Sequence, residues 1–484
     1  MNNNEKKILL YLSDVRKQFV LSKRTRGKRV LVNALNGISL AVYENETLGI
    51  VGETGCGKTT LGRIIAFSLE ATSGNIFFDA PGDKIQEILE LQKKCLEQRN
   101  GHGKEIPSEI GTECIELQKL MSKYALKYGN KKAVREYRKK VQMVFQDPFS
   151  SLDPRKFIRD SVAEPIRLLT TENVDKVTRE VIKEVGLSED HLYRFPHEFS
   201  GGQRQRIGIA RAISVKPKLI VLDEPTLALD VSVQAQILNL LKDIQERENV
   251  TYVFITHNLS VTRAMSDRVA VMYLGEVVEL AGVKELFEKM LHPYTMTLFS
   301  SIPVPDPQAK IAEVEIDGEI PDPKNLPNGC YFHTRCPVAT PYCGWSPEDM
   351  AEPILDLLDP LKNPDIGSAV SAKEVSIDSD QNLLIVELEN QENAGIIRKM
   401  NDSMVRMSAG RGGTKYLSIS SVELEGNSRL IFHFVEPKKP HLVEVNKDHF
   451  VSCILYTEER SDNDKEIITA GTSVKGVAVE KNLS

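Results

Sequence analysis

Short apolar runs separated by turn-forming residues make up the first part of the chain. Residues 8–80 contain several such runs, and the run Thr47–Val51 leads directly into a glycine-rich turn. This order predicts a buried strand, a tight turn and a helix that begins near Thr59. The same alternation of strand and helix patterns returns from Val141 to about Ser301. We therefore expect a parallel sheet covered by helices, that is, an α/β domain at residues 1–301.

The sequence between Gly82 and Lys140 differs in composition and periodicity from the segments on either side. It contains many charged residues, and its apolar residues recur at helical spacing. Two apolar stripes predict two helices, and the stretch Asn100–Pro107 separates them. The stripes consist of Ile85, Ile88, Leu89 and Leu96, and of Leu117, Leu120, Met121, Tyr124 and Tyr128. We therefore expect an inserted helical hairpin at about residues 83–138.

Basic residues recur every four positions in the second half of this insertion. They are Lys119, Lys123, Lys127, Lys131 and Arg135. If the helix continued through Gly129 and Asn130, these cations would form one stripe able to meet anionic lipid. A solvated charged face is the simpler interpretation, and charge patterns of this kind favour it.

Prolines crowd residues 303–327 and mark a linker to a second domain, which we expect at residues 302–456. Three strand patterns follow, at Leu383–Leu388, Tyr416–Leu424 and Leu430–Val435, and the turn-forming stretch Glu425–Ser428 joins the last two. They predict a sheet-containing insertion at about residues 346–440 of an α+β domain. Residues 457–484 form a polar tail.

Composition describes an ordinary globular protein. Of 484 residues, 41% are hydrophobic and 27% charged, and the formal net charge of -6 gives no reason to expect nucleic acid as a partner. No apolar stretch approaches the length that spans a bilayer, and the polar start MNNNEKK lacks the apolar core of a signal peptide. A cytoplasmic location is therefore expected. The seven cysteines then indicate metal or redox roles rather than a disulfide framework.

A phosphate-binding loop is the first chemical motif. The segment from Gly52 to Thr59 fits the pattern GxxxxGK[ST] between a predicted strand and helix. Its glycines let backbone N–H groups face phosphate oxygens, while Lys58 supplies positive charge and the Thr59 hydroxyl can bind magnesium. A plain glycine-rich turn is the alternative, which the strand and helix context disfavours. The expected nucleotide-binding residues here are Gly52, Glu53, Thr54, Gly55, Cys56, Gly57, Lys58, Thr59 and Thr60.

An acidic pair, Asp223 and Glu224, follows the apolar run Leu219–Leu222. This places two carboxylates at the carboxyl edge of the predicted sheet, where nucleotides bind in such folds. Asp223 is suited to hold magnesium through water, and Glu224 to act as a general base toward the attacking water. A solvated loop is the alternative, which the presence of the phosphate-binding loop makes unfavourable.

The string Phe199–Gln205, FSGGQRQ, resembles the signature motif of ABC ATPases. Three further segments resemble the family's other motifs in order. They are Gln146 in VFQDP for the Q-loop, Ala228–Asp230 for the D-loop and His257 in ITHNLS for the switch histidine. Phe19 in VRKQF resembles the aromatic residue on which the family stacks adenine, although a single Phe near a strand is usually a core residue. The resemblance implies an enzyme that hydrolyses ATP with Mg²⁺. It assigns catalytic roles to Glu224, His257 and Gln146, and magnesium binding to Thr59, Gln146 and Asp223.

In this family two ATPase units enclose ATP head to tail. The resemblance therefore implies that the signature motif and D-loop complete the nucleotide site of a partner unit. The residues concerned are Ser200, Gly201, Gly202, Gln203 and Asp230. Leu227 departs from the family, in which a serine commonly precedes the Ala-Leu-Asp of the D-loop.

Longer segments resemble one branch of the family, the ATPases that power oligopeptide and dipeptide importers. They are GETGCGKTTLGR, VFQDPFSSLDPR, LDVSVQAQ, VMYLGEVVE and HPYTMTLFSSIP. The resemblance covers most of residues 8–82 and 141–345 and fails over 83–138 and 346–440. It implies a translocase subunit at the cytoplasmic face of the cell membrane, held peripherally. The implied partners are a second, related ATPase that forms a heterodimer with this chain, two permease subunits and an extracytoplasmic solute-binding protein.

Two alternative functions remain at this stage. Related importers move oligosaccharides or nickel, and the cargo is chosen by subunits other than this one. A soluble ABC protein of translation or DNA repair is less well supported, because the chain carries one ATPase domain followed by an importer-type tail.

The cysteines near the C-terminus form a further pattern. Cys330, Cys336 and Cys343, together with Cys453 beyond the insertion, resemble the cysteine motif at the C-terminal end of many of these ATPases. The resemblance implies a [4Fe-4S] cluster. Four thiolates also suit zinc, and buried, unreactive thiols are the simplest alternative. Cys56, Cys95 and Cys114 are expected to be bystanders.

Overall fold

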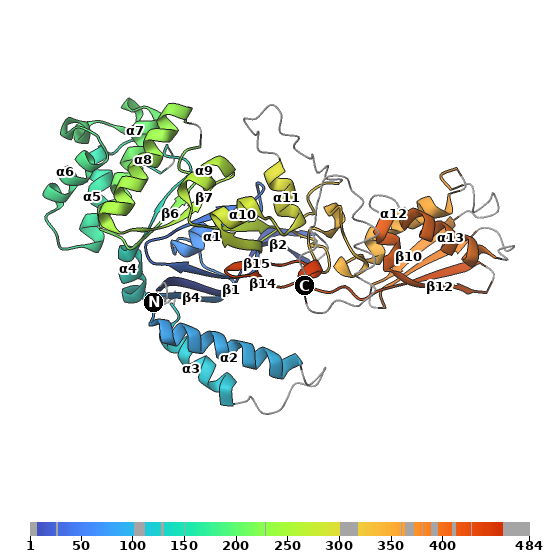
Figure 1. The fold of residues 1–484 in the computed structure, drawn as a ribbon. Coiled ribbons are helices and arrows are strands. Elements are labelled where there is room, and N and C mark those ends of the chain that lie inside the picture. Colours follow the sequence, from blue (N-terminus) through green and yellow to red (C-terminus); the bar gives the residue numbers. More distant parts are fainter. Residues whose placement is uncertain are drawn as a thin grey trace. The chain divides into compact units, whose positions relative to one another are not determined.

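The computed structural model divides the chain into two compact units (Figure 1). The first comprises Met1–Val277 and Ala281–Leu286, and the second Val278–Leu280 and Phe287–Ser484. The structure describes residues 7–25, 28–100, 112–126, 130–149, 151–227, 229–300, 318–359, 361–363, 372–379, 381–388, 395–408, 413–426 and 428–457. Residues 101–107 of the predicted linker, much of the proline-rich segment and nearly all of the polar tail lie outside these residues.

A parallel sheet forms the centre of the first unit. Its strands run in the order β8-β3-β7-β6-β5 and are parallel to their neighbours. Their bounds are β3 Thr47–Val51, β5 Val141–Val144, β6 Leu219–Asp223, β7 Thr251–Ile255 and β8 Arg268–Tyr273. Every residue of β3, β6 and β7 is buried, as continuous apolar runs in a sheet covered on both faces require. The predicted α/β fold is confirmed.

Helices flank this sheet, and α1, α7, α8 and α9 begin at or directly after predicted motifs. They are α1 Lys58–Ile65, α5 Ile158–Leu169, α6 Val174–Glu184, α7 Gly201–Ile213, α8 Val231–Glu248, α9 Leu259–Met265 and α10 Val283–Glu288. The strand predicted before the phosphate-binding loop has the expected bounds, and the helix after it begins at Lys58, one residue earlier than predicted.

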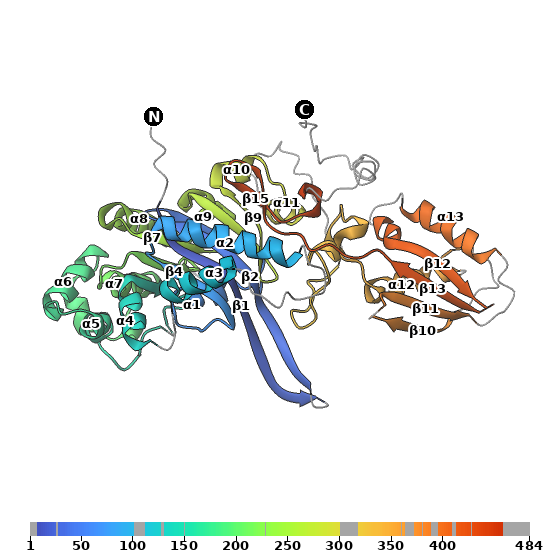
Figure 2. The same cartoon turned by 90° about the horizontal axis from the view of Figure 1, so that it is seen from below.

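An antiparallel sheet of three strands forms a second layer of this unit. Its order is β2-β1-β4, with bounds β1 Ile8–Thr25, β2 Lys28–Tyr43 and β4 Ser73–Phe78. β4 pairs with β1 only from Leu10 to Arg16, whereas β1 and β2 pair along their whole length. The far part of this ribbon, residues 17–25 and 28–33, therefore has no third strand. We call it the arm, and Figure 2 shows it extending away from the other strands of the unit.

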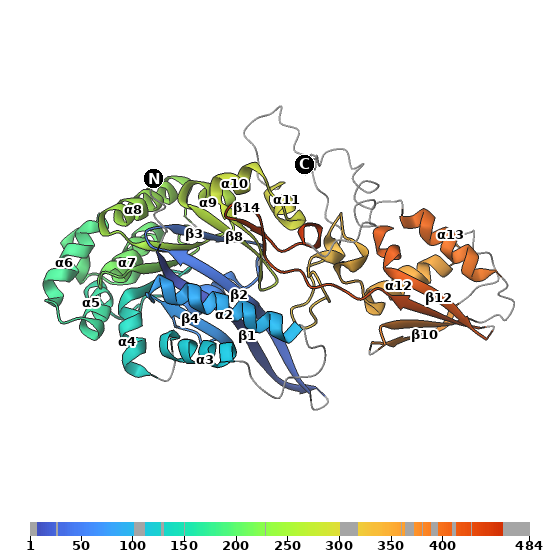
Figure 3. The same cartoon turned by 60° about the horizontal axis from the view of Figure 1, so that its bottom comes forward.

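The segment between β4 and β5 contains helices α2 Gly82–Asn100, α3 Thr112–Tyr124 and α4 Lys131–Lys140. Apolar residues of α2 and α3 pack with Tyr11 of β1 and Phe77 of β4, and Figure 3 shows both helices along the antiparallel sheet. Helix α3 ends at Tyr124, and α4 begins anew after Asn130, whose side chain caps it by accepting from the Ala133 N–H. The continuous basic helix considered from the sequence is therefore not formed.

A disulfide joins Cys95 of α2 to Cys114 of α3. The sequence analysis treated both cysteines as bystanders, and that prediction is wrong. Packing of the two helices side by side brings these positions together, with a Cα–Cα distance of 5.8 Å, although they are 19 positions apart in the chain. That distance lies in the range that a disulfide spans.

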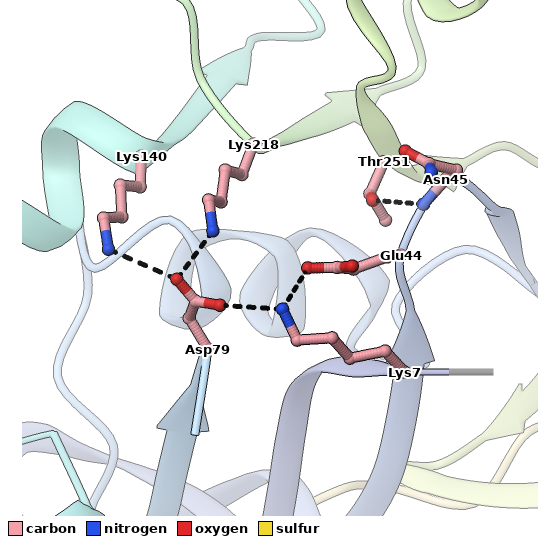
Figure 4. A network of polar contacts seen from close by, with 7 residues as sticks. All are labelled: Lys7, Glu44, Asn45, Asp79, Lys140, Lys218 and Thr251. Carbon is pink, nitrogen blue, oxygen red and sulfur yellow. Dashed lines mark hydrogen bonds and ion pairs between the residues drawn. The ribbon is translucent and has the colours of Figure 1, made fainter. Parts of the chain in front are cut away.

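Ion pairs hold together the two ends of the segment between β4 and β5 (Figure 4). Asp79, just before α2, lies 3.3 Å from Lys140 at the end of α4 and 2.7 Å from Lys218. Lys7 bridges Asp79 at 3.3 Å and Glu44 at 2.6 Å. Partial burial by itself would raise the pKa of the Asp79 carboxyl. Hydrogen bonds from Lys218, Lys140 and Lys7 outweigh this effect and lower the pKa to about 2. The network thus fixes where the insertion leaves the sheet and where it returns.

The second unit contains a four-stranded antiparallel sheet with the order β10-β11-β13-β12. Its strands are β10 Ala372–Asp378, β11 Leu383–Leu388, β12 Ile419–Glu425 and β13 Arg429–Phe434. Helices α12 Pro347–Leu358 and α13 Ile396–Ser408 pack with the apolar side chains of β11 and β13 in one core. The strand predicted from Tyr416 begins at Ile419, because Gly413–Ser418 forms a short 3-10 helix.

The chain then returns through a short hairpin, β14 Val443–Asn446 and β15 His449–Val451. β15 pairs with Glu279 and Leu280 of β9 Glu276–Gly282, and α11 Pro293–Ser300 belongs to the same unit. The Glu279 carboxylate, which is fully buried, lies 2.8 Å from His449 Nε2 and accepts the Leu291 N–H at 2.8 Å. In the described part of the chain, no helix is long and apolar enough to cross a membrane.

Candidate active site

The phosphate-binding loop links β3 to α1 and curls around the Lys58 side chain. The Lys58 ammonium is 6% exposed and donates to the carbonyl oxygens of Gly52 at 2.8 Å and Glu53 at 2.9 Å. It therefore lies at the centre of the loop, where phosphate charge is bound in this motif. Thr54 and Gly55 are exposed at the loop surface.

Gly57, which precedes α1, shows why this turn needs glycine. Its φ is 103°, and a β-carbon at this position would lie 2.5 Å from the Ala34 carbonyl oxygen. Only glycine adopts this backbone readily and avoids that clash. The first N–H groups of α1 consequently face the loop opening, which is a favourable place for an anion.

Cys56 is buried within the same loop, with its sulfur 3.8 Å from Lys58 Nζ. Burial raises the pKa of the Cys56 thiol, although the nearby Lys58 opposes this effect. The protonated thiol is therefore the favoured form, and Cys56 acts as a packing residue of the loop.

Thr59 and Asp223 form the part of the site suited to magnesium. The Thr59 hydroxyl on α1 lies 3.0 Å from Asp223 Oδ1 at the end of β6. Asp223 is 1% exposed, and burial raises the pKa of its carboxyl even though the Thr59 hydroxyl stabilises the carboxylate. Two hard oxygen ligands, one of them a buried carboxylate, fit the ligand preference of Mg²⁺, and a bound cation would favour the ionised carboxylate.

The side chains of two predicted catalytic residues, Gln146 and His257, both contact the third, Glu224. Its Oε2 accepts from Gln146 Nε2 at 3.1 Å, and its Oε1 lies 3.1 Å from His257 Nδ1. Gln146 follows β5, Glu224 follows β6 and His257 follows β7, so neighbouring parallel strands bring the three to one sheet edge. This arrangement can hold a water molecule and accept its proton.

The predicted signature residues begin α7. The Ser200 hydroxyl accepts from the Gln203 N–H at 3.3 Å, and the Gln203 side chain accepts from the Ser200 N–H at 3.0 Å. This reciprocal capping box fixes the first turn of the helix. The Gln203 side-chain oxygen is therefore already engaged by a hydrogen bond within this chain. The N–H groups at the start of α7 produce a local positive potential.

Asp230 is the N-cap residue of α8. Its Oδ1 accepts from the Val233 N–H at 3.0 Å and from the Ser232 hydroxyl, and these bonds lower the pKa of the carboxyl. Ala228 of the predicted D-loop lies outside the described residues, while Leu227 is 39% exposed.

Phe19, the predicted adenine-stacking residue, lies on β1 opposite Val32 of β2. Its side chain is 39% exposed, and Lys17 Nζ lies 5.1 Å from the ring centre. An exposed aromatic face beside a cation is compatible with stacking on a nucleotide base.

Comparison with known proteins identifies the family of this chain. A family model described as ABC transporter matches residues 35–227, and one described as oligopeptide/dipeptide transporter, C-terminal region, matches residues 278–343. The oligopeptide transport ATP-binding protein AppF of Bacillus subtilis is 43% identical over 341 residues, which cover 69% of this chain and 91% of the relative. The chain belongs to the oligopeptide/dipeptide branch of the ABC transporter ATP-binding proteins. It is an ABC ATPase.

Other relatives of this ABC ATPase show the same pattern of coverage. The oligopeptide transport ATP-binding protein OppF of Salmonella typhimurium is 39% identical over 351 residues, covering 70% of this chain and 91% of the relative. OppF of Escherichia coli is 40% identical over 350 residues, which cover 70% of this chain and 91% of that relative. The relatives are thus matched almost throughout, whereas about a third of this chain has no counterpart in them.

The cysteine motif requires a correction. Burial, and then the neighbouring thiols of Cys343, Cys453 and Cys330, raise the pKa of Cys336 well above its ordinary value. Cys343 belongs to an apolar core, and its sulfur accepts from the Thr340 N–H at 3.1 Å. Across the described residues, no group of three or more His, Cys, Asp or Glu side chains is arranged to hold a metal ion. The predicted [4Fe-4S] cluster and its zinc alternative are therefore wrong. Cys343 and Cys453 are instead buried free cysteines, and Cys330 and Cys336 are partly buried ones.

Two features of the structure had no signal in the sequence. The pair formed by Glu279 and His449 crosses 170 residues, so no local pattern reveals it. Asp79 precedes the insertion as one acidic residue among many, and only the fold brings Lys7, Lys140 and Lys218 around it. Charge neutralisation inside a folded unit depends on three-dimensional proximity and not on spacing along the chain.

Proposed function

We propose that this chain is the subunit that binds and hydrolyses ATP to energise the import of oligopeptides or dipeptides through a membrane ABC transporter. The observation that carries the proposal is the convergence of Gln146, Glu224 and His257 beside the pair formed by Thr59 and Asp223. The match to peptide transport ATP-binding proteins over 91% of their length supports the cargo class.

Each residue has a defined part in hydrolysis. Lys58 and the loop N–H groups bind and orient the phosphates, while Thr59 and Asp223, with Gln146, would hold Mg²⁺, which neutralises phosphate charge when bound. Glu224 accepts the proton of the attacking water, and Gln146 and His257 position the Glu224 carboxylate through its two oxygens. Phe19 and Thr60 are proposed to complete the nucleotide-binding set.

The site is proposed to be completed by a second, related ATPase that forms a heterodimer with this chain. Ser200 caps helix α7, and the N–H groups of Gly201 and Gly202 in its first turn are available to the phosphates of a nucleotide bound by the partner. Asp230 is fixed by its own capping bonds beside this surface. Two permease subunits and an extracytoplasmic solute-binding protein complete the proposed assembly at the cytoplasmic face of the membrane.

The proposed domain division follows the family match. Residues 1–301 form the ATPase domain with a helical insertion at about 83–138, and residues 302–456 a family-specific domain with a sheet-containing insertion at about 346–440. The family models match residues 35–227 and 278–343, which is compatible with this division.

Uptake into vesicles that contain the assembled transporter tests the proposal. With Mg²⁺ and ATP on the side of the ATPase, labelled dipeptide or oligopeptide should accumulate, and replacing this chain by its Glu224→Gln variant should stop accumulation. Uptake of an oligosaccharide or of nickel, and not of peptide, would show that the transporter imports that solute instead. No ATP-dependent uptake of any of these solutes by an assembly that hydrolyses ATP would contradict the importer function.

A further inference from the structure

The disulfide between Cys95 and Cys114 is separate from the contacts that hold the inserted helices to the antiparallel sheet. Ile85 and Ile88, in the first half of α2, are fully buried in a cluster with residues of β1 and β4. Directly after α3, Ala125 forms a β-bridge with strand β4. Cys95 lies in the second half of α2 and Cys114 in the first turn of α3, so the disulfide closes the other end of this helical pair. Opening the disulfide therefore leaves the anchoring contacts in place.

Access from solvent differs between the two sulfur atoms of this disulfide. Cys95 is 8% exposed, whereas Cys114 is half-buried and lines a cavity of about 360 Å³. The cavity lies between α3 and Asn75 of β4. Gln118 and Ser122, which also line it, are exposed, so the cavity is open to solvent. A molecule that enters the cavity therefore reaches the Cys114 sulfur first.

The proposed location of the chain brings this disulfide into contact with reducing thiols. At the cytoplasmic face of a membrane, low-molecular-weight thiols keep most cysteines reduced, and a disulfide there is usually transient and serves catalysis or redox sensing. This disulfide lies in the inserted helices and not among the residues of the nucleotide site. Its position thus favours a redox response over a catalytic role.

We propose that Cys114 is a thiol–disulfide exchange site for a low-molecular-weight thiol such as glutathione, and that the exchange opens a redox-sensitive clamp between α2 and α3. The cavity beside Cys114 admits the thiol, while the anchoring contacts keep both helices on the sheet. This inference rests on the proposed function for the location of the chain. It goes beyond that function by adding a modification site to the inserted segment.

The exchange proceeds in two steps whose atoms and electrons balance. The thiolate of the first small molecule attacks the Cys114 sulfur and forms a mixed disulfide, and Cys95 leaves as a thiolate that takes up the proton released by the attacking thiol. A second small thiol then attacks the sulfur of the first, so that Cys114 leaves as a thiol. Two small thiols are thereby oxidised to one disulfide, and their two electrons reduce Cys95 and Cys114.

Mapping of adducts on the purified full chain tests this proposal and needs no variant. The folded chain is treated briefly with excess reduced glutathione, free thiols are then alkylated, and peptides are identified by mass spectrometry. Because access favours attack at Cys114, glutathione should be found on Cys114 at least about tenfold more often than on Cys95. A disulfide that persists in the folded chain but is lost after unfolding in urea would overturn the proposal, as would adducts that are as frequent on Cys95.

Amide hydrogen exchange of the reduced chain tests the clamp. Exchange should become about tenfold faster around Cys95 and Cys114 and stay unchanged around Ile85 and Ile88, because these parts of α2 keep their packing on the sheet. Unchanged exchange around the two cysteines, or fast exchange throughout both helices, would overturn the assignment of a local clamp.

Two substitutions at Ser122 test entry through the cavity. Ser122→Phe fills space beside Cys114 and should slow the reaction with glutathione by about tenfold, whereas the matched control Ser122→Ala keeps the cavity open and should react as the unchanged chain does. Both variants should keep the thermal midpoint, because Ser122 is exposed. Equal rates for the two variants would overturn the assignment of the cavity as the entry route. These assays use neither ATP nor transport, so their failure leaves the proposed importer function unaffected.

Discussion

Glu224 occupies an unusual backbone conformation for a residue with a β-carbon, with φ at 45°. Its N–H donates to the Ile255 carbonyl oxygen at 2.9 Å, which holds this conformation at the end of β6. Such conformations cost about 1–3 kcal/mol and persist where the surrounding structure fixes them. Here the result is a carboxylate that faces Gln146 and His257 at once.

Replacing Glu224 by Gln should abolish turnover and preserve nucleotide binding. The amide keeps the size of the side chain but accepts no proton, and loss of a general base lowers a rate by about 10²- to 10⁴-fold. Phosphate release and ATP affinity of the assembled ATPase pair provide the two measurements. Glu246→Gln, at an exposed position on α8, is the control and should leave both unchanged. A Glu224→Gln assembly that hydrolyses ATP at a near-normal rate would remove the general-base role.

Helix α7 lies close against helix α8 at the signature motif. A β-carbon on Gly202 would lie 2.4 Å from Val233 Cγ1, whereas one on Gly208 of the same helix would meet nothing within 4 Å. The signature motif therefore has two structural roles. Ser200 caps the start of α7, and Gly202 allows α7 to pack closely against α8. The two glycines offer a matched pair for testing this close approach.

Gly202→Ala should destabilise the chain by about 1–3 kcal/mol, the usual cost of an overpacked contact. Gly208→Ala should instead be neutral or stabilise α7 by up to about 1 kcal/mol, because alanine is the better helix former. Denaturant unfolding of the purified chain measures both. Adding Val233→Ala to Gly202→Ala should recover part of the loss. Equal effects of the two glycine substitutions would show that the approach of α7 to α8 is not tight.

The ion-pair network at Asp79 makes the base of the inserted helices sensitive to acid. The pKa of this carboxyl is lowered to about 2 in the folded state. The ionised carboxylate therefore stabilises the fold fully when the pH is above its ordinary pKa, near 4, and this stabilisation is lost as the pH falls toward 2. Asp79→Asn should therefore lower the free energy of unfolding by about 2 kcal/mol at neutral pH, with the difference shrinking below about pH 4. Denaturant unfolding at several pH values measures this.

Asp83→Asn is the matched control for that measurement. Its side chain is 72% exposed and lies 3.8 Å from Lys84, and exposed ion pairs contribute little. A loss of stability in Asp79→Asn that is the same at pH 7 and at pH 3 would show that packing, and not charge, carries the effect.

At the scale of the whole molecule, one chain supplies two different halves of a nucleotide site. The phosphate-binding loop and Glu224 lie at the sheet edge, while the signature residues begin α7. Within the proposed heterodimer each half meets the complementary half of the partner. The chain alone is therefore expected to bind ATP without a complete hydrolytic site.

Hydrolysis should accordingly depend on association. The purified chain at concentrations too low for dimers should release phosphate slowly, and adding the related ATPase of the same importer should raise the rate per chain. Substituting Ser200 in this chain should then lower hydrolysis at the partner's site, while Glu224→Gln lowers it at its own. Full activity of the isolated monomer would contradict the composite site.

The sequence by itself determined the features that depend on neighbours along the chain. The loop from Gly52 to Thr59, the strand before it and the acidic pair after β6 follow from local backbone and hydrophobic requirements. The family was recognisable for the same reason, because its motifs are short and contiguous. The helical and strand patterns of the two inserted segments were also readable, since amphipathic periodicity is a local property.

Only the tertiary structure decided what depends on distance in space. It joined Cys95 to Cys114, gathered three lysines around Asp79 and left apolar residues of the arm uncovered. It also left the C-terminal cysteines as buried or partly buried free cysteines where the resemblance to the family had implied a metal cluster. Spacing along a chain limits which groups can meet, but burial and packing set whether a thiol ionises, whether a charge is paired and whether an apolar surface is covered.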